Sequence, residues 1–163
     1  MGLAEVSSIL WKERELLELL LFKLEEEQLV LASGRSRWLA HATREVEFVL
    51  EQIRSTELLR AVEVDAVAEQ LGLAPSPSLT VLAQNAPEPW DQLFGAHRDA
   101  FLTLTAEIQT LADANRDLLS TGGRALREAL LGLDEGLDTY TAQGKNDSGP
   151  RAGNRAYFVD KAF

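Results

Sequence analysis

Two histidines and several runs of glutamate are the residues of this 163-residue sequence whose chemistry could serve a metal site or catalysis. A carboxylate-bridged metal site in a helical bundle requires a Glu-x-x-His motif on two of the helices. The residue three positions before His41 is Trp38, and the residue three positions before His97 is Phe94. Because the motif is absent at both histidines, we expect neither a metal ion nor a cofactor.

The individual polar residues fit structural roles better than chemical ones. His41 has Glu45 one helical turn later, which favours an exposed ion pair, and His97 lies on an apolar seam, which favours a hydrogen-bonded interior or boundary histidine. Consecutive side chains at 25–27 point about 100° apart on a helix and cannot converge on a metal, so this Glu run predicts a solvated face. Asn115, also on a seam, is typical of an Asn that fixes helix register.

The usual nucleophile and phosphate-binding motifs are missing as well. The sequence contains no cysteine, which excludes thiolate chemistry and disulfides. The Gly122–Gly123 pair lacks the Lys-Ser/Thr that follows the glycines of a phosphate-binding loop. No Ser or Lys is placed by a motif near a base. We therefore expect a protein that is not an enzyme.

The net charge of the chain restricts the classes of partner that it is expected to bind. The net charge is −10 and the sequence pI is about 4.7. Nucleic acid and anionic membranes attract clustered Lys and Arg, so neither is an expected partner. The N-terminus does not have the pattern of a signal peptide, because Glu5 and Lys12 interrupt it. The apolar run at 16–24 contains charges and is too short for a membrane span. Together with the absence of cysteine, these features favour a cytoplasmic protein that binds other proteins.

Helical periodicity dominates the chain and predicts an all-α fold. We expect an elongated bundle of three long antiparallel helices with a short crossover helix and a flexible C-terminal tail. The long helices are predicted at about 3–32, 36–71 and 89–139, and the short helix at about 79–84 in a Pro-rich crossover. Residues 1–140 would form the helical domain, and residues 141–163, rich in Gly and polar residues, the tail. Ser33–Gly34 and Gly72 are the predicted helix ends.

The apolar seams predict how the helices pack. Residues 16–24 are apolar on nearly every side of a helix, which indicates a central helix or a docking surface. The second helix has a coiled-coil seam that then shifts around the helix: Leu39, Ala42, Val46, Val49 and Ile53, followed by Leu59, Val62 and Ala66. The third has a longer seam: His97, Phe101, Leu104, Ile108, Leu111, Asn115, Leu118 and Gly122. The glycine pair predicts a kink or a close crossing by a neighbouring helix.

The C-terminal part of the third helix and the tail contain the candidate binding residues. After the glycine pair the seam resumes as Leu126, Leu130, Leu133 and Leu137, the spacing that helix-in-groove recognition uses. The same leucines could instead pack on the first or second helix. The tail ends with Tyr157 and Phe158 close together, which suit a short docking segment or an unstructured terminus with no role.

The chain resembles the FlgN family of flagellar type III export chaperones. The resemblance covers nearly the whole chain and rests on three segments in order: the run 20–27 (Leu-Leu-Phe-Lys-Leu-Glu-Glu-Glu), Asn115-Arg-Asp-Leu-Leu at 115–119, and Tyr140-Thr-Ala-Gln-Gly at 140–144. The glycine pair inside the last helix departs from the family's pattern and puts the straightness of that surface in doubt.

The resemblance implies a specific function and set of partners. FlgN-like chaperones hold the hook–filament junction proteins FlgK and FlgL in the cytosol, cover the terminal helical segments that would otherwise polymerise, and deliver them to the export gate protein FlhA. By this resemblance the cargo site is the Leu126, Leu130, Leu133 and Leu137 stripe, and Tyr140 takes part in docking at the gate.

A second interpretation from another class explains the seams equally well. A structural coiled-coil adaptor, or a self-associating helical module, would need the seams but neither Tyr140 nor residues 141–163. Long seams are compatible with a monomer and with an antiparallel homodimer, and the sequence leaves both open.

Overall fold

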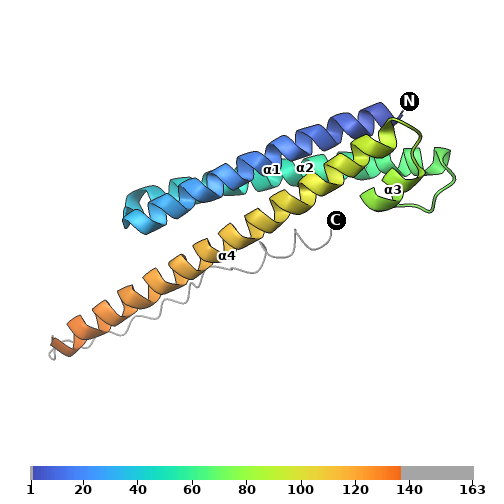
Figure 1. Ribbon diagram of the computed structural model, residues 1–163. Helices are drawn as coiled ribbons and strands as arrows, with labels where there is room; N and C mark the ends of the chain where they lie inside the picture. The colour runs from blue at the N-terminus through green and yellow to red at the C-terminus, as the bar shows by residue number, and fades with distance from the viewer. Residues whose placement is uncertain (1, 137–163) are drawn as a thin grey trace.

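The computed structural model describes residues 2–136, and these residues form an elongated, all-α arrangement (Figure 1). The helices are α1 (Gly2–Ser33), a single 3-10 turn η1 (Ser36–Trp38), α2 (Leu39–Gln70), α3 (Leu79–Asn85) and α4 (Trp90–Gly136). No strand is present in this described range, which confirms the predicted fold class. The predicted tail, 141–163, lies outside the described residues.

α1 is the central helix, as one of the two interpretations of its apolar sequence predicted. It packs against α2 along one side and against α4 along another, while α3 packs on α4 near the N-terminal end of the bundle (Figure 1). Contacts at Glu13–Arg60 and Lys23–Glu45 show that α1 and α2 are antiparallel. Contacts at Trp11–His97 and Leu24–Asn115 show that α1 and α4 are parallel. The chain therefore reverses direction after α1 and again after α2, with α3 in the connection between α2 and α4.

Glycines end the first two long helices. Gly34 follows α1 and Gly72 follows α2, and both have φ of +68°, in the left-handed region that favours glycine. After α2, the amide of Leu73 donates to the carbonyl of Ala68 and the amide of Gly72 donates to that of Glu69. This pair of bonds is the Schellman motif, which satisfies the carbonyls left open at a helix C-terminus.

The core stripe of α2 differs from the predicted one in its second half. Ala42, Val46, Val49 and Ile53 are buried as expected, but the inner face then continues through Thr56 and Val67. Leu59 and Val62, which were predicted to continue the seam, are more than half exposed. The reason is that α2 keeps the rotation of its first half: Arg60 also lies on the inner face, where it pairs with the buried Glu13 of α1.

α4 packs through most of its predicted seam. Phe94, His97, Phe101, Ile108 and Asn115 are buried. The helix then runs through Gly122 as continuous α-helix. Of the two alternatives predicted for the glycine pair, a close crossing by a described helix is excluded at Gly122, because a Cβ there would meet no atom of the described chain within 4 Å. None of the described helices has the length and hydropathy needed to cross a membrane.

Candidate partner-binding surface

A buried polar network sets the relative positions of α1, α2 and α4. The Glu27 carboxylate accepts hydrogen bonds from Thr43 Oγ1 of α2, at 2.9 Å, and from Asn115 Nδ2 of α4, at 3.1 Å. Asn115 also donates to the main-chain carbonyl of Leu24, at 2.9 Å. The prediction that Glu25–Glu27 form a solvated face is therefore wrong for Glu27, which is fully buried. The interpretation of Asn115 as a register-fixing residue agrees with these bonds.

A second polar cluster lies closer to the N-terminal end of α1. Glu13 is fully buried, and its Oε2 lies 3.0 Å from Nη1 of Arg60. Burial raises the pKa of Glu13 to about 7, against the opposing effect of the Arg60 charge and with a smaller contribution from Glu57. His97 is also buried, with Trp11 edge-on at 4.9 Å between ring centroids. Burial, assisted by the Arg14 charge, lowers the pKa of His97 to about 4.

Perturbed pKa values often mark active sites, but here the groups are enclosed by packed helices. Two grooves on the described surface, one between α1 and α4 and the other between α2 and the α3 region, are not lined by Glu13 or His97. Arg60, the ion-pair partner of Glu13, lines the second groove. Both ring nitrogens of His97 also lack a hydrogen-bond partner within the described chain, which corrects the expectation of a hydrogen-bonded histidine. These groups are therefore placed to affect stability rather than to meet a substrate.

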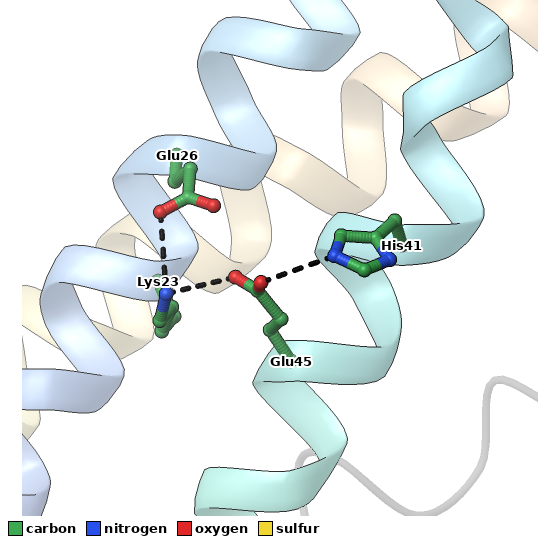
Figure 2. A network of polar contacts seen from close by, with 4 residues as sticks. All are labelled: Lys23, Glu26, His41 and Glu45. Carbon is green, nitrogen blue, oxygen red and sulfur yellow. Dashed lines mark hydrogen bonds and ion pairs between the residues drawn. The ribbon is translucent and has the colours of Figure 1, made fainter.

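A further group of polar contacts lies near the surface, between α1 and α2. Figure 2 shows Lys23 between Glu26 and Glu45, at 3.4 and 2.8 Å, with His41 at 3.4 Å from Glu45. His41 is exposed beside Glu45, as predicted, and their contact is an ion pair when the imidazole is protonated. Such surface pairs contribute little to stability, because solvent and salt screen the charges. Within residues 2–136, no three His, Asp or Glu side chains are grouped so that they could hold a metal ion.

α4 continues beyond the end of the other long helices, and this overhang is the candidate binding surface (Figure 1). Asn115 is the last buried residue of α4 whose side chain is described, and it lies beside Leu24 and Glu27, near the end of α1. Every described side chain from 116 to 131 is exposed. At 1.5 Å per residue, the part of α4 beyond Gly122 is about 20 Å long.

The structure places the predicted cargo residues unevenly. Leu130 lies on the overhang with 55% of its surface exposed, which excludes packing on α1 or α2 for this residue. The backbone of Leu126 and Leu133 belongs to α4, but their side chains are not among those that the structure describes. Leu137, Tyr140, Tyr157 and Phe158 lie outside the described residues altogether.

The sequence analysis did not identify every exposed leucine of the α4 overhang. Leu131, next to Leu130, is 63% exposed. Leu118 and Leu119 are also exposed, although Leu118 was predicted to lie on the packed seam. Adjacent leucines point about 100° apart, so both can be exposed only where a helix lacks neighbours over a wide arc. The paired leucines at 118–119 and 130–131 were the available signal for such a segment.

These features define an all-α helical bundle protein with a long exposed helical extension. The comparison with protein families identifies the family to which it belongs. The family model described as FlgN protein matches residues 1–148, nine-tenths of the chain, and the chain belongs to this family. FlgN proteins are flagellar export chaperones. Comparisons with curated proteins and with solved structures gave no match.

Proposed function

We propose that this chain is the cytoplasmic export chaperone of hook–filament junction proteins of the FlgK and FlgL kind. It binds their terminal helical segments on the α4 overhang, prevents premature assembly and delivers them to an FlhA-like export gate. Binding is stoichiometric and reversible, with no bond made or broken, so the proposal includes no enzymatic step. Family membership supports the general function, and the partners follow from the resemblance.

The observation that carries the proposal is that Leu130 is exposed on the part of α4 that extends beyond the other long helices. An apolar stripe on such a helix, with Leu126 and Leu133 one turn away on either side, suits the burial of an amphipathic helix of the cargo. Burying one leucine side chain contributes about 1.5–3 kcal/mol, so a few leucines supply a useful affinity. Tyr140 is proposed to contact the gate, and Tyr157 and Phe158 to dock on a partner.

The first experiment is co-purification of the full-length chain with the FlgK-like and FlgL-like proteins of the same genome. The matched variants are Leu130→Asp on the overhang and Leu102→Asp, a leucine of similar exposure within the bundled part of α4. We expect Leu130→Asp to weaken the complex about tenfold or more, and Leu102→Asp to leave it intact. Circular dichroism should show unchanged helicity for both, because neither side chain is buried.

Two further variants separate the cargo site from the other proposed contacts. Tyr140→Ala should reduce binding to the isolated cytoplasmic domain of the gate protein and leave cargo binding unchanged. A chain that ends after Ala142 keeps every described residue, and loss of cargo from it would assign the tail to cargo capture.

The alternative is a structural coiled-coil adaptor or self-associating module, which the unpartnered overhang also supports. It predicts a concentration-dependent homodimer in analytical ultracentrifugation, no complex with either junction protein, and full function without residues 141–163. A cargo complex that survives Leu130→Asp would instead show that the binding surface lies elsewhere on the chain.

A further inference from the structure

α2 has a second apolar stripe on the face that points away from α1. Phe48, Leu58, Leu59 and Val62 are between 58% and 72% exposed. The buried face of the same helix includes Val46, Val49 and Ile53, which pack in the core. Phe48, Leu59 and Val62 share one exposed face of the helix and Leu58 lies at its edge, so together they exceed the scattered single exposures that are normal on protein surfaces.

The spacing of this face is that of a coiled-coil seam. Positions 48, 52, 55, 59, 62 and 66 follow steps of four and three, and hold Phe, Gln, Ser, Leu, Val and Ala. This pattern keeps one line of side chains facing a partner helix over about 28 Å. The described helices do not cover it, since α2 packs on α1 through its other face and α4 packs on α1 and α3.

The charges beside the seam indicate what kind of helix fits. The exposed residues flanking the seam include four carboxylates and one base: Glu47, Glu51, Asp65, Glu69 and Arg44. The carboxylate of Asp65 also accepts a hydrogen bond from the main-chain amide of Ser76, at 2.7 Å. Arg54 lies 3.5 Å from Glu51 and offsets part of that charge. A second copy would bring an identical acidic rim opposite this one, and the whole chain carries a net charge of −10, so self-pairing is opposed.

We propose that the outer face of α2 is a second docking site, separate from the α4 overhang, for a basic amphipathic helix of another protein. Apolar residues of that helix, spaced three and four apart, pack on Phe48, Leu59 and Val62. Lys or Arg side chains on its flanks pair with the acidic rim of α2. The chaperone can then hold its cargo on α4 and a different helical protein on α2.

The probe is a synthetic helical peptide of three heptads with Leu at the a and d positions and Lys at e and g. One control peptide has the same composition in scrambled order, and a second has Glu in place of Lys. Binding to the full-length chain is measured by fluorescence anisotropy at physiological ionic strength. We expect the Lys peptide to bind, and the scrambled and Glu peptides to bind at least about tenfold more weakly.

Two double variants test the face itself. Leu59→Gln with Val62→Gln should weaken the Lys peptide about tenfold or more, because two apolar contacts are lost. Leu102→Gln with Leu29→Gln is the matched control, since both leucines are exposed elsewhere and their change should leave binding within about twofold. Glu51→Lys with Glu69→Lys should exchange the preference, so that the Glu peptide becomes the tighter one.

Three results would overturn the proposal. Equal binding of the scrambled peptide would show a general attraction between an acidic protein and a cation. Unchanged binding by the Leu59→Gln, Val62→Gln variant would place the peptide elsewhere. A photo-crosslinking residue at position 62 that joins, without peptide, to a second copy or to residues 137–163 would show that the chain itself covers this face. Cargo capture through Leu130 is measured separately, so the two proposals can fail independently.

Discussion

The side-chain amide of Asn115 donates a hydrogen bond to the main-chain carbonyl of Leu24, across 2.9 Å and between helices that are parallel. The carbonyl lies in the interior of α1, and the same Asn115 nitrogen also reaches the carboxylate of Glu27, at 3.1 Å. A one-turn slip of α4 along α1 would break both contacts and bury unpaired polar groups. This pair of contacts therefore fixes the register of α4, and with it the point where the overhang begins.

Replacing Asn115 with alanine should destabilise the fold by about 1–3 kcal/mol, because the buried Glu27 carboxylate would lose one of its donors. The measurement is chemical denaturation followed by circular dichroism. Arg116→Ala, the exposed neighbour on the same helix, is the matched control and should change stability by about 0.5 kcal/mol or less. Equal effects from the two changes would show that Asn115 does not fix the register.

The buried carboxyl of Glu13 should make stability fall as the pH rises from about 4.5 to about 7. Its pKa is raised to about 7, chiefly by burial, so in this window the folded chain keeps a proton that the unfolded chain has released. Glu13→Gln removes this group. The difference in unfolding free energy, wild type minus variant, should therefore decrease across the window, by at most about 3 kcal/mol.

Denaturation at a series of pH values measures this difference, and Glu18→Gln, at an exposed position on the same helix, is the control for removal of one charge. A difference for Glu13→Gln that stays flat between pH 4.5 and 7 would mean that Arg60 keeps the Glu13 carboxylate ionised throughout.

His97 should make stability change with pH in the opposite direction to Glu13. Its pKa is lowered to about 4, mainly by burial, so between about pH 4 and 6.5 the unfolded chain binds a proton that the folded chain does not. The contribution to stability is complete above pH 6.5 and is lost as the pH falls towards 4. His97→Leu keeps an apolar side chain beside Trp11 and removes the titration. Its stability relative to wild type should rise as the pH is lowered, again by at most about 3 kcal/mol, in thermal melts at fixed pH.

Replacing Gly122 or Gly72 with alanine should change the stability of the fold in opposite directions. Gly122→Ala should stabilise α4 by up to about 1 kcal/mol, since the added Cβ meets no described atom and alanine favours the helix. Gly72→Ala should destabilise by about 1 kcal/mol, because its φ of +68° disfavours any residue with a Cβ. Melting temperatures of the two variants test both signs. A loss of stability in Gly122→Ala would indicate that another chain packs closely against this position.

Local features of the sequence were sufficient for much of the fold. The spacing of apolar residues predicted long helices, and the seam from His97 to Asn115 is buried or partly buried. Gly34 and Gly72 were predicted as helix ends because the left-handed backbone there favours glycine, and both have positive φ. Helix formation and helix termination depend on residues within a few positions of each other, so such signals can be recognised in a single chain.

The tertiary structure decided which face of each helix is covered. From the sequence, Glu27 belongs to a solvated run and Leu59 and Val62 to a seam, yet Glu27 is buried and the two apolar residues are exposed. The reason is that Glu27 meets Thr43 and Asn115 only after three helices have come together. Likewise, Arg60 faces inward because Glu13, 47 positions earlier in the chain, is buried opposite it. The burial of a polar residue depends on partners distant in sequence, and its own helical spacing does not reveal them.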